Sequence, residues 1–183
     1  MNKKNRGFTL IELLAVIIIL SILMIIAVPS VTKYISDARK KAYVSTISSY
    51  VQSVSVKMLA FGFDQKPSIN QALLIPFSEI KMEKKAVSPY GKFLEEQCYI
   101  IVLANDGGKY SFYVNIKDSS GYKVYNVKSS NININTPTTS TNIKDPVKIS
   151  EIKNGIIVKI GENNFKISEN NNIDSKFILL ESA

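Results

Sequence analysis

The chain lacks most of the residue types from which enzymes and metal sites are built. None of its 183 residues is histidine, and Cys98 is its single cysteine. An intrachain disulfide and a cysteine-based zinc cluster are therefore both excluded. Glycine-rich phosphate loops and the HExxH and GxSxG motifs are also absent from the sequence. These absences predict a protein that is not an enzyme, with no catalytic residue, no cofactor and no metal.

Acidic and basic residues do not group into a binding site. Glu95 and Glu96 are adjacent at a strand entry, where neighbouring side chains point to opposite sides and cannot act as an acid and base pair. Asp106 and Asp118 are candidate calcium ligands, but the EF-hand spacing is absent. The net charge is +8, and +5 without the basic residues of the leader 1–7. We expect a solvated basic surface, with DNA or a host surface as candidate partners.

One long apolar run lies near the N-terminus, over residues 8–28. As a helix these 21 residues are long enough to cross a hydrocarbon core about 30 Å thick. The run is apolar on every face, so it must lie in lipid or inside other protein. Glu12 is its single charge. Because a carboxylate costs up to about 3 kcal/mol in the middle of a membrane, Glu12 needs a partner or a function.

This run differs from the apolar region of a secretory signal peptide. It is longer than the usual length of about 7–15 residues, and no Ala-x-Ala cleavage site follows it. The small residue instead precedes the run, as Gly7. The basic heptapeptide that ends in Gly7, the letters FTLIELL of residues 8–14 and the later Pro29 resemble the class III signal of type IV prepilins and the related pseudopilins. Without a disulfide, the chain is similar to the Gram-positive type of these proteins.

The resemblance implies a processing and assembly route. A prepilin peptidase would cut between Gly7 and Phe8, the new Phe8 amine would be N-methylated, and the helix would wait in the membrane before it packs into a filament core. The precursor would be a single-pass protein of the bacterial cell membrane, and the product an extracellular pilus on the cell surface. The implied partners are other pilin subunits, the prepilin peptidase, the assembly platform protein and its ATPase.

Glu12 has a physical role in this interpretation. Cleavage creates a cationic amine at Phe8, and Glu12 of a neighbouring subunit would neutralise it in a low-dielectric core, where a lone charge is costly. Glu12 then sets the register of assembly. The alternative is an uncleaved signal anchor, in which Glu12 reaches back toward the headgroups.

After the run, an amphipathic helix is predicted over residues 29–61. Pro29 removes an N–H and crowds the carbonyl of Ile25, which predicts a kink. Apolar residues then recur at steps of three to five, which predicts a stripe packed under a head domain. The members of this stripe are Val31, Ile35, Ala38, Ala42, Ile47, Val51, Val54 and Met58. Gly62 and Pro67 are expected to end the helix.

An αβ-loop region is predicted over 62–96 and an antiparallel sheet over 97–183. The first contains a short helix over 68–74 and a tight turn over 88–91. In the second, the hairpin signal Asn105-Asp106-Gly107-Gly108 separates the first two of four or five strands. The expected strands are 97–104, 109–117, 121–129, 155–160, 165–168 and, as a further candidate, 177–180. The second strand turns Tyr110, Phe112, Val114 and Ile116 toward the helix.

Residues 129–146 are rich in serine, threonine and asparagine and predict a long exposed loop, with an adhesive or O-glycosylated patch as the alternative. Cys98 is expected to be a buried, inert thiol. The predicted fold class is α+β, in which a long N-terminal helix is packed by an antiparallel β-meander head, as in pilins.

We therefore predict a structural subunit of a bacterial type IV pilus, polymerised through its N-terminal helix. Cell adhesion, twitching motility and DNA uptake are the activities that such a fibre would serve. A minor pilin, or a pseudopilin of a secretion or DNA-uptake system, is the nearest alternative. A single-pass membrane-anchored binding or sensor domain is the second.

Overall fold

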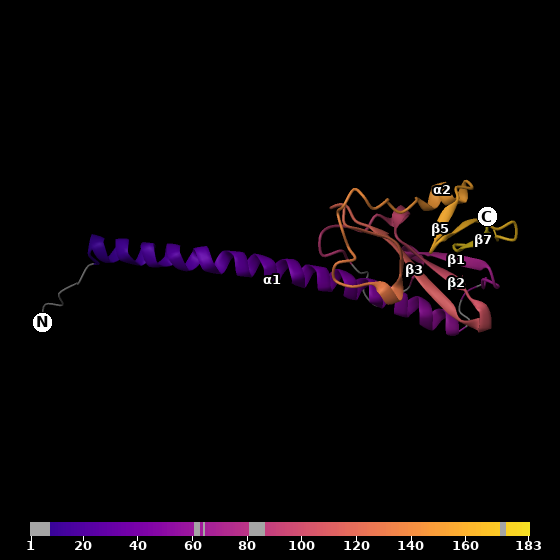
Figure 1. The fold of residues 1–183 in the computed structure, drawn as a ribbon, viewed down its shortest axis with the longest axis horizontal. Coiled ribbons are helices and arrows are strands. Elements are labelled where there is room, and N and C mark those ends of the chain that lie inside the picture. The colour runs from indigo at the N-terminus through magenta and orange to yellow at the C-terminus, as the bar shows by residue number, and fades with distance from the viewer. Residues whose placement is uncertain (1–7, 61–62, 64, 81–86, 173–174) are drawn as a thin grey trace, which may run out of the picture. The chain divides into compact units, whose positions relative to one another are not determined.

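The computed structural model describes residues 8–60, 63, 65–80, 87–172 and 175–183. The chain divides into two compact units, Met1–Ala38 and Arg39–Ala183. Helix α1, Leu10–Leu59, supplies the helical part of the first unit and the first element of the second. The rest of the second unit is a sheet with short helices, which we call the head together with residues 39–59 of α1 (Figure 1).

Helix α1 begins directly after Thr9 and continues through Pro29 without a break in its helical assignment. Isoleucine-rich runs are poor helix formers in water, but lipid forces the backbone to satisfy its own hydrogen bonds. The hydroxyls of Ser21 and Thr32 donate to the backbone carbonyl four residues earlier, at 2.7 and 2.8 Å. These two hydroxyls are thus bonded to the backbone of their own helix. The kink at Pro29 stays a prediction.

Seven strands form one antiparallel sheet among the described residues of the head. They are β1 Gln71–Pro76, β2 Tyr99–Ala104, β3 Tyr110–Lys117, β4 Lys123–Lys128, β5 Val158–Ile160, β6 Asn163–Ile167 and β7 Ile178–Ser182. Their order across the sheet is β4-β3-β2-β1-β7-β6-β5. The first strand is therefore central, between β2 and β7, and its pairing with β7 joins Gln71 to Glu181 near the end of the chain.

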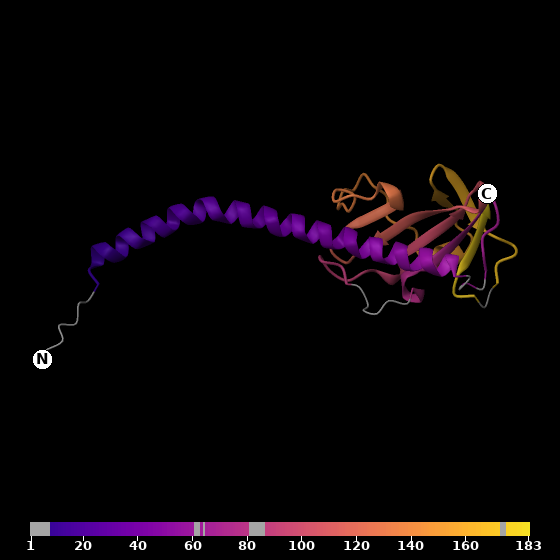
Figure 2. The same cartoon turned by 90° about the horizontal axis from the view of Figure 1, so that it is seen from below.

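One face of the sheet packs on the second half of α1, which crosses the strands in Figure 2. The helix buries one side chain per turn, from Tyr43, Ile47, Tyr50, Val54 and Met58. The sheet contributes Leu73, Ile75, Ile100, Val102, Val114, Ile116 and Val124 to the same core. Each large apolar side chain buried here contributes about 1.5–3 kcal/mol. The predicted contact between the helix and the face of β3 is confirmed.

The predicted stripe on α1 is wrong in part. Val31, Ile35 and Ala38 are exposed, and Ala42 is exposed where its neighbour Tyr43 is fully buried. The buried face starts at Tyr43 and also includes Tyr50, because the head covers only the later turns of the helix. Two tyrosines thus hold positions that the aliphatic pattern alone does not reveal.

The other face of the sheet has a core of its own. Helix α2, Ile149–Lys153, places Ile149 and Ile152 against it. The strands add Ala72, Leu74, Tyr99, Ile101, Val158, Ile160, Phe165, Ile178 and Leu180. Strand β1 is therefore buried on both faces, with every residue from Ala72 to Pro76 buried.

Three sequence predictions of the head need correction. The short helix over 68–74 is wrong, because its C-terminal part belongs to β1. A strand buried on both faces reads as a continuous apolar run, which lacks the alternation of a half-exposed strand. The sheet has seven strands and not four or five, and α2 was not predicted. The hairpin at 105–108 is confirmed, with Gly107 and Gly108 at φ of 75° and 72°.

Four short 3₁₀ turns also occur in the part of the head that the structure describes. They are Phe77–Glu79, Glu95–Gln97, Asp106–Gly108 and Ser129–Asn131. The last begins the loop over 129–146, which contains no strand or α-helix. The α+β class with a long N-terminal helix and an antiparallel head is confirmed.

Candidate processing and assembly site

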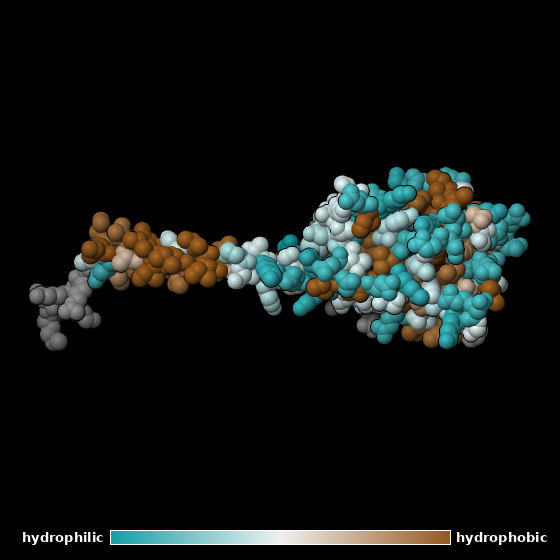
Figure 3. All heavy atoms as spheres, in the orientation of Figure 1, coloured by the Kyte–Doolittle hydropathy of each residue, from teal (hydrophilic) through white to brown (hydrophobic). Residues whose placement is uncertain are grey.

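The first unit presents an apolar surface that the chain does not cover. Its helix is long and apolar enough to cross a membrane by length and composition, and none of its most apolar stretch is buried. Ile18 is 52% exposed and Ile25 is 74% exposed. Figure 3 shows this segment as hydrophobic over nearly all of the face in view. Such a surface needs lipid or other protein around it.

The N-terminus of α1 is closed by a pair of residues, Thr9 and Glu12. The backbone N–H of Thr9 donates to Glu12 Oε2 at 2.8 Å, and the Thr9 hydroxyl donates to the same oxygen at 2.9 Å. In return, the Glu12 N–H donates to Thr9 Oγ1 at 3.3 Å. This is a capping box, which satisfies backbone donors that have no partner in the first turn of a helix.

The capping box explains how a charged residue is tolerated at the start of an apolar helix. The Glu12 carboxylate lies near the positive end of the helix dipole and is hydrogen-bonded within its own chain. Sequence reasoning selected Glu12 but missed Thr9. The signal was present as the spacing Thr-x-x-Glu directly before an apolar run, which is typical of a helix N-terminus.

Phe8 is the first described residue, with a side chain 86% exposed and a backbone outside the helix. Gly7, the other half of the predicted cleavage site, lies outside the described residues. Cleavage at this bond, methylation of Phe8 and the register role of Glu12 stay predictions. Phe8 is one residue away from the Thr9 cap, so a new amine at Phe8 would lie beside the Glu12 carboxylate or that of a neighbour.

The predicted turn over 88–91 is anchored to the head through Asp118. The Ser88 hydroxyl donates to Asp118 Oδ2 at 2.6 Å, and both residues are buried. Asp118 Oδ1 accepts the backbone N–H groups of Ser120 and Tyr122, at 3.0 and 2.9 Å. Both oxygens of Asp118 are thus engaged by protein donors. Asp106 lies at the opposite end of the eight-residue strand β3, so the two acids do not form a calcium site.

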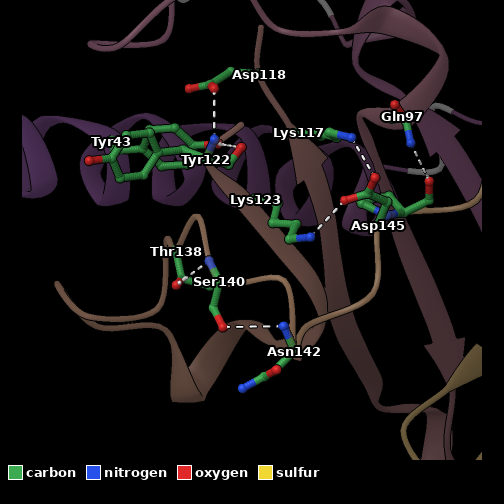
Figure 4. Close-up of polar contacts among 11 residues, drawn as sticks. Tyr43, Gln97, Lys117, Asp118, Tyr122, Lys123, Thr138, Ser140, Asn142 and Asp145 are labelled. Atoms are coloured by element: carbon green, nitrogen blue, oxygen red, sulfur yellow. Dashed lines mark hydrogen bonds and ion pairs between the residues drawn. The ribbon is translucent and has the colours of Figure 1, made fainter. Parts of the chain in front are cut away.

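An aromatic cluster that the sequence did not predict joins this turn to α1. The rings of Tyr90 and Tyr122 stack with centroids 3.7 Å apart. Tyr43 of α1 contacts Phe93 edge to face at 5.7 Å, and its hydroxyl reaches the Tyr122 carbonyl at 3.4 Å (Figure 4). Burial raises the pKa of Tyr43 above the usual range of tyrosine. The cluster therefore fixes the helix to two loops of the head by uncharged contacts.

Cys98 is fully buried and free, and its predicted burial is confirmed. Its thiol donates to the Lys117 carbonyl at 3.2 Å. Burial raises the pKa of the Cys98 thiol to about 12. Because the thiolate is the reactive form, this cysteine is protonated and unreactive at neutral pH.

The loop over 129–146 is more firmly held than its composition predicts. Asp145 forms ion pairs with Lys117 of β3 and with Lys123 of β4, the second at 2.8 Å (Figure 4). Hydrogen bonds from Lys117 and Lys123 lower the pKa of Asp145. The Gln97 side chain donates to the Pro146 carbonyl at 2.6 Å. The loop is exposed along most of its length, as predicted, but its end is fastened to the sheet.

Residues 2–28 match the family described as the prokaryotic N-terminal methylation motif. The chain is 39% identical over 95 residues to the competence protein ComGC of Bacillus subtilis, a match that covers 50% of this chain and 87% of that protein. It is 34% identical over 96 residues to the ComG operon protein 3 homolog of Bacillus licheniformis, covering 52% of this chain and 91% of the relative. No solved structure matches the chain with significance.

Proposed function

The chain belongs to the type IV pilin-like proteins with a prepilin methylation motif, and from that membership we propose that it is the structural subunit of a DNA-uptake filament. The two relatives are a competence protein and a ComG operon protein homolog, which favours DNA uptake, the alternative that the sequence left open. The precursor would first be held in the membrane. It would then be assembled outside the membrane into a homopolymer, with or without minor pilins.

The observation that carries this proposal is the exposed apolar helix with a capped acid at its start. Lipid can cover this helix in the precursor, and other copies of the same helix can cover it in a filament. Packing against other helices adds van der Waals contacts and hydrogen bonds that lipid does not supply. The predicted Phe8 amine then supplies the cation that Glu12 needs once both are out of water.

Maturation at Gly7 would change what the capping box can do. Before cleavage, Phe8 carries a neutral peptide N–H, and Thr9 donates two hydrogen bonds to Glu12 Oε2. After cleavage, the amine at Phe8 adds a positive charge next to this cap. A carboxylate and an ammonium group attract each other far more strongly in a low-dielectric core than in water. Cleavage would thereby permit an ion pair between subunits that the precursor lacks.

The proposal assigns no catalysis to the chain. The work of processing and export falls to the prepilin peptidase, the platform protein and the ATPase. An exposed pilus for adhesion or twitching motility is a second candidate, favoured by the uncharged loop residues 129–143 on the surface of the head.

Mass spectrometry of the mature N-terminal peptide tests the processing step, in cells with and without the prepilin peptidase. We expect a chain that starts at Phe8, with or without one methyl group, only where the peptidase is present. A chain that starts at Met1 in both strains would overturn the proposed filament subunit and favour a membrane-anchored binding domain.

Deletion of the gene tests the uptake step. We expect loss of sheared surface filaments together with loss of labelled DNA that is protected from external nuclease. Normal DNA uptake with lost filaments would instead support the adhesion or motility pilus.

A further inference from the structure

The two outer strands of the head, β4 and β5, are placed where another chain could add a strand. An exposed sheet edge presents unpaired N–H and C=O groups, and these pair readily with a strand from a neighbour. Subunits that are held at high density in a membrane or a filament meet this hazard continually. The state of these two edges therefore determines how the heads can contact one another.

The start of β4 is covered by the chain itself. Lys123 donates its N–H to the Thr138 carbonyl at 2.9 Å, and Thr138 donates back to the Lys123 carbonyl at 3.1 Å. These two bonds form an isolated antiparallel bridge on the side of β4 that faces away from β3. The ion pair of Asp145 with Lys123 holds the same loop in place.

The middle of β4 is joined to the turn after β5 by a side-chain amide. Asn126 Nδ2 donates to the Gly161 carbonyl at 2.9 Å, and the Gly161 N–H donates to Asn126 Oδ1, also at 2.9 Å. A primary amide carries a donor and an acceptor side by side, as a peptide group does. Gly161 directly follows β5, so this bridge joins one outer strand of the sheet to the turn beside the other.

The backbone on both sides of the bridge is adapted to it. Asn126 has a left-handed φ of 54°, and its N–H bonds to Oδ1 of the buried Asn115 at 3.0 Å. The pairing of β3 with β4 shifts register at this position, between Val114 and Ile116. Gly161 has a φ of 59°, and a Cβ there would lie 2.9 Å from the Tyr113 hydroxyl. A left-handed non-glycine residue is costly and persists only where the surroundings stabilise it.

The other outer strand, β5, is protected because it is short and carries a charged side chain. Strand β5 has only three residues, Val158–Ile160, and its middle residue Lys159 is exposed. Lys159 pairs with Glu162 in the following turn at 2.9 Å. Short edge strands with charged side chains are a known protection against strand addition.

We propose that the head is closed to strand addition, because the Lys123–Thr138 pair occupies the free side of β4 at its start and the Asn126–Gly161 amide bridge holds the turn after β5 beside its middle. Neighbouring subunits then contact one another through α1 and through side chains, without sharing a β-sheet. The inference concerns the folded head and holds whether or not the chain polymerises.

The test compares two substitutions in the full-length chain in detergent micelles. Asn126→Gly keeps a residue that adopts a left-handed φ without strain and removes only the amide bridge. Asn70→Gly is the matched control, because Asn70 is also a non-glycine residue with positive φ, at 64°, and lies in an exposed turn. The readouts are amide hydrogen exchange at Gly161 and the infrared band of intermolecular β-sheet.

For Asn126→Gly we expect exchange at Gly161 to rise about three- to tenfold, the effect of one lost hydrogen bond, and the intermolecular band to appear. Asn70→Gly should change neither. Gly161→Ala, which attacks the bridge from its other side, should act as Asn126→Gly does. Unchanged exchange at Gly161 would show that the bridge does not protect the Gly161 N–H. Raised exchange without the intermolecular band would show that the bridge is not a barrier to strand addition.

Discussion

The apolar first unit and the head solve the problem of hydrophobic burial in opposite ways. The head buries its apolar residues on both faces of one sheet and leaves mostly single apolar side chains at its surface. Helix α1 before Ala38 buries none of its most apolar stretch. The head is therefore folded by its own contacts, whereas the first unit depends on a medium or on partners.

This difference teaches how one helix can have two functions. In the head, residues 39–59 of α1 bury one side chain per turn from Tyr43 onward, and most of the other side chains are polar. In the first unit, the apolar run has no distinct polar face, so any face of the helix can contact lipid or another helix. A segment of this kind fits both an anchor in a membrane and the core of a filament.

The largest effect is expected from Glu12→Ala. Filament yield should fall by at least about tenfold, because the Phe8 amine of a neighbour would lose its counterion in a low-dielectric core. The midpoint of urea unfolding of the head should not move. Immunoblots of sheared surface fractions and of the membrane pool measure the filament yield, and urea denaturation measures the midpoint. Glu12→Gln, which keeps the cap acceptor but not the charge, separates the two roles of the residue. Full assembly of Glu12→Gln would show that the charge is dispensable.

Two isoleucines of α1, one in each unit, test whether the head is stable without contacts from the first unit. Ile47→Ala should destabilise the head by about 2–4 kcal/mol, because Ile47 is fully buried against the sheet and its removal leaves a cavity. Ile18→Ala, 52% exposed in the first unit, should leave the unfolding of the head unchanged. Urea denaturation of both variants in micelles, followed by near-ultraviolet circular dichroism, gives the difference. Equal losses would mean that the head depends on the first unit for its stability.

Local patterns were sufficient to predict the features that depend on neighbouring residues. The apolar run, the Gly7-Phe8 and Glu12 motif and the hairpin at Gly107-Gly108 each follow from a few consecutive residues. The match of residues 2–28 to the methylation motif supports the prepilin interpretation of that region. The burial of Cys98 followed from a strand-forming run in the same way.

Features that depend on distant residues could not be predicted. Strand β1 was read as a helix because its central position, between β2 and β7, is set by strands that come later in the chain. The Asn126–Gly161 bridge joins residues 35 positions apart, and neither residue type indicates the other. Tyr43 was missed because its burial depends on where the head begins to cover the helix.

The ion pairs of Asp145 with Lys117 and Lys123 hold the end of the loop over 129–146, and their loss should give a smaller effect that depends on pH. Asp145→Asn should lower the stability of the head by about 0.2–1 kcal/mol at pH 7, since the pair is partly exposed and screened. The pKa of Asp145 is lowered in the folded state, so its contribution is present above the ordinary carboxylate pKa of about 3.9 and is lost as the pH falls through the folded value. The difference between wild type and variant in urea unfolding should be constant from pH 7 to about pH 4 and then shrink. A constant difference down to pH 2 would exclude the ion pair as its cause.

The smallest effect is expected at the cap of the first unit. Thr9→Ala removes one hydroxyl that both donates to Glu12 and accepts its N–H, and a lost cap changes helix formation by about fivefold. Thr9→Ser keeps the hydroxyl and should behave as wild type. Because Glu12 and the predicted amine remain, filament yield should fall far less in Thr9→Ala than in Glu12→Ala, while exchange at the Glu12 N–H rises. If Thr9→Ala instead abolished filaments as fully as Glu12→Ala, the position of the carboxylate, and not its charge alone, would limit assembly. The cap would then prepare the exposed segment for its partners, in the way that buried contacts prepare the head.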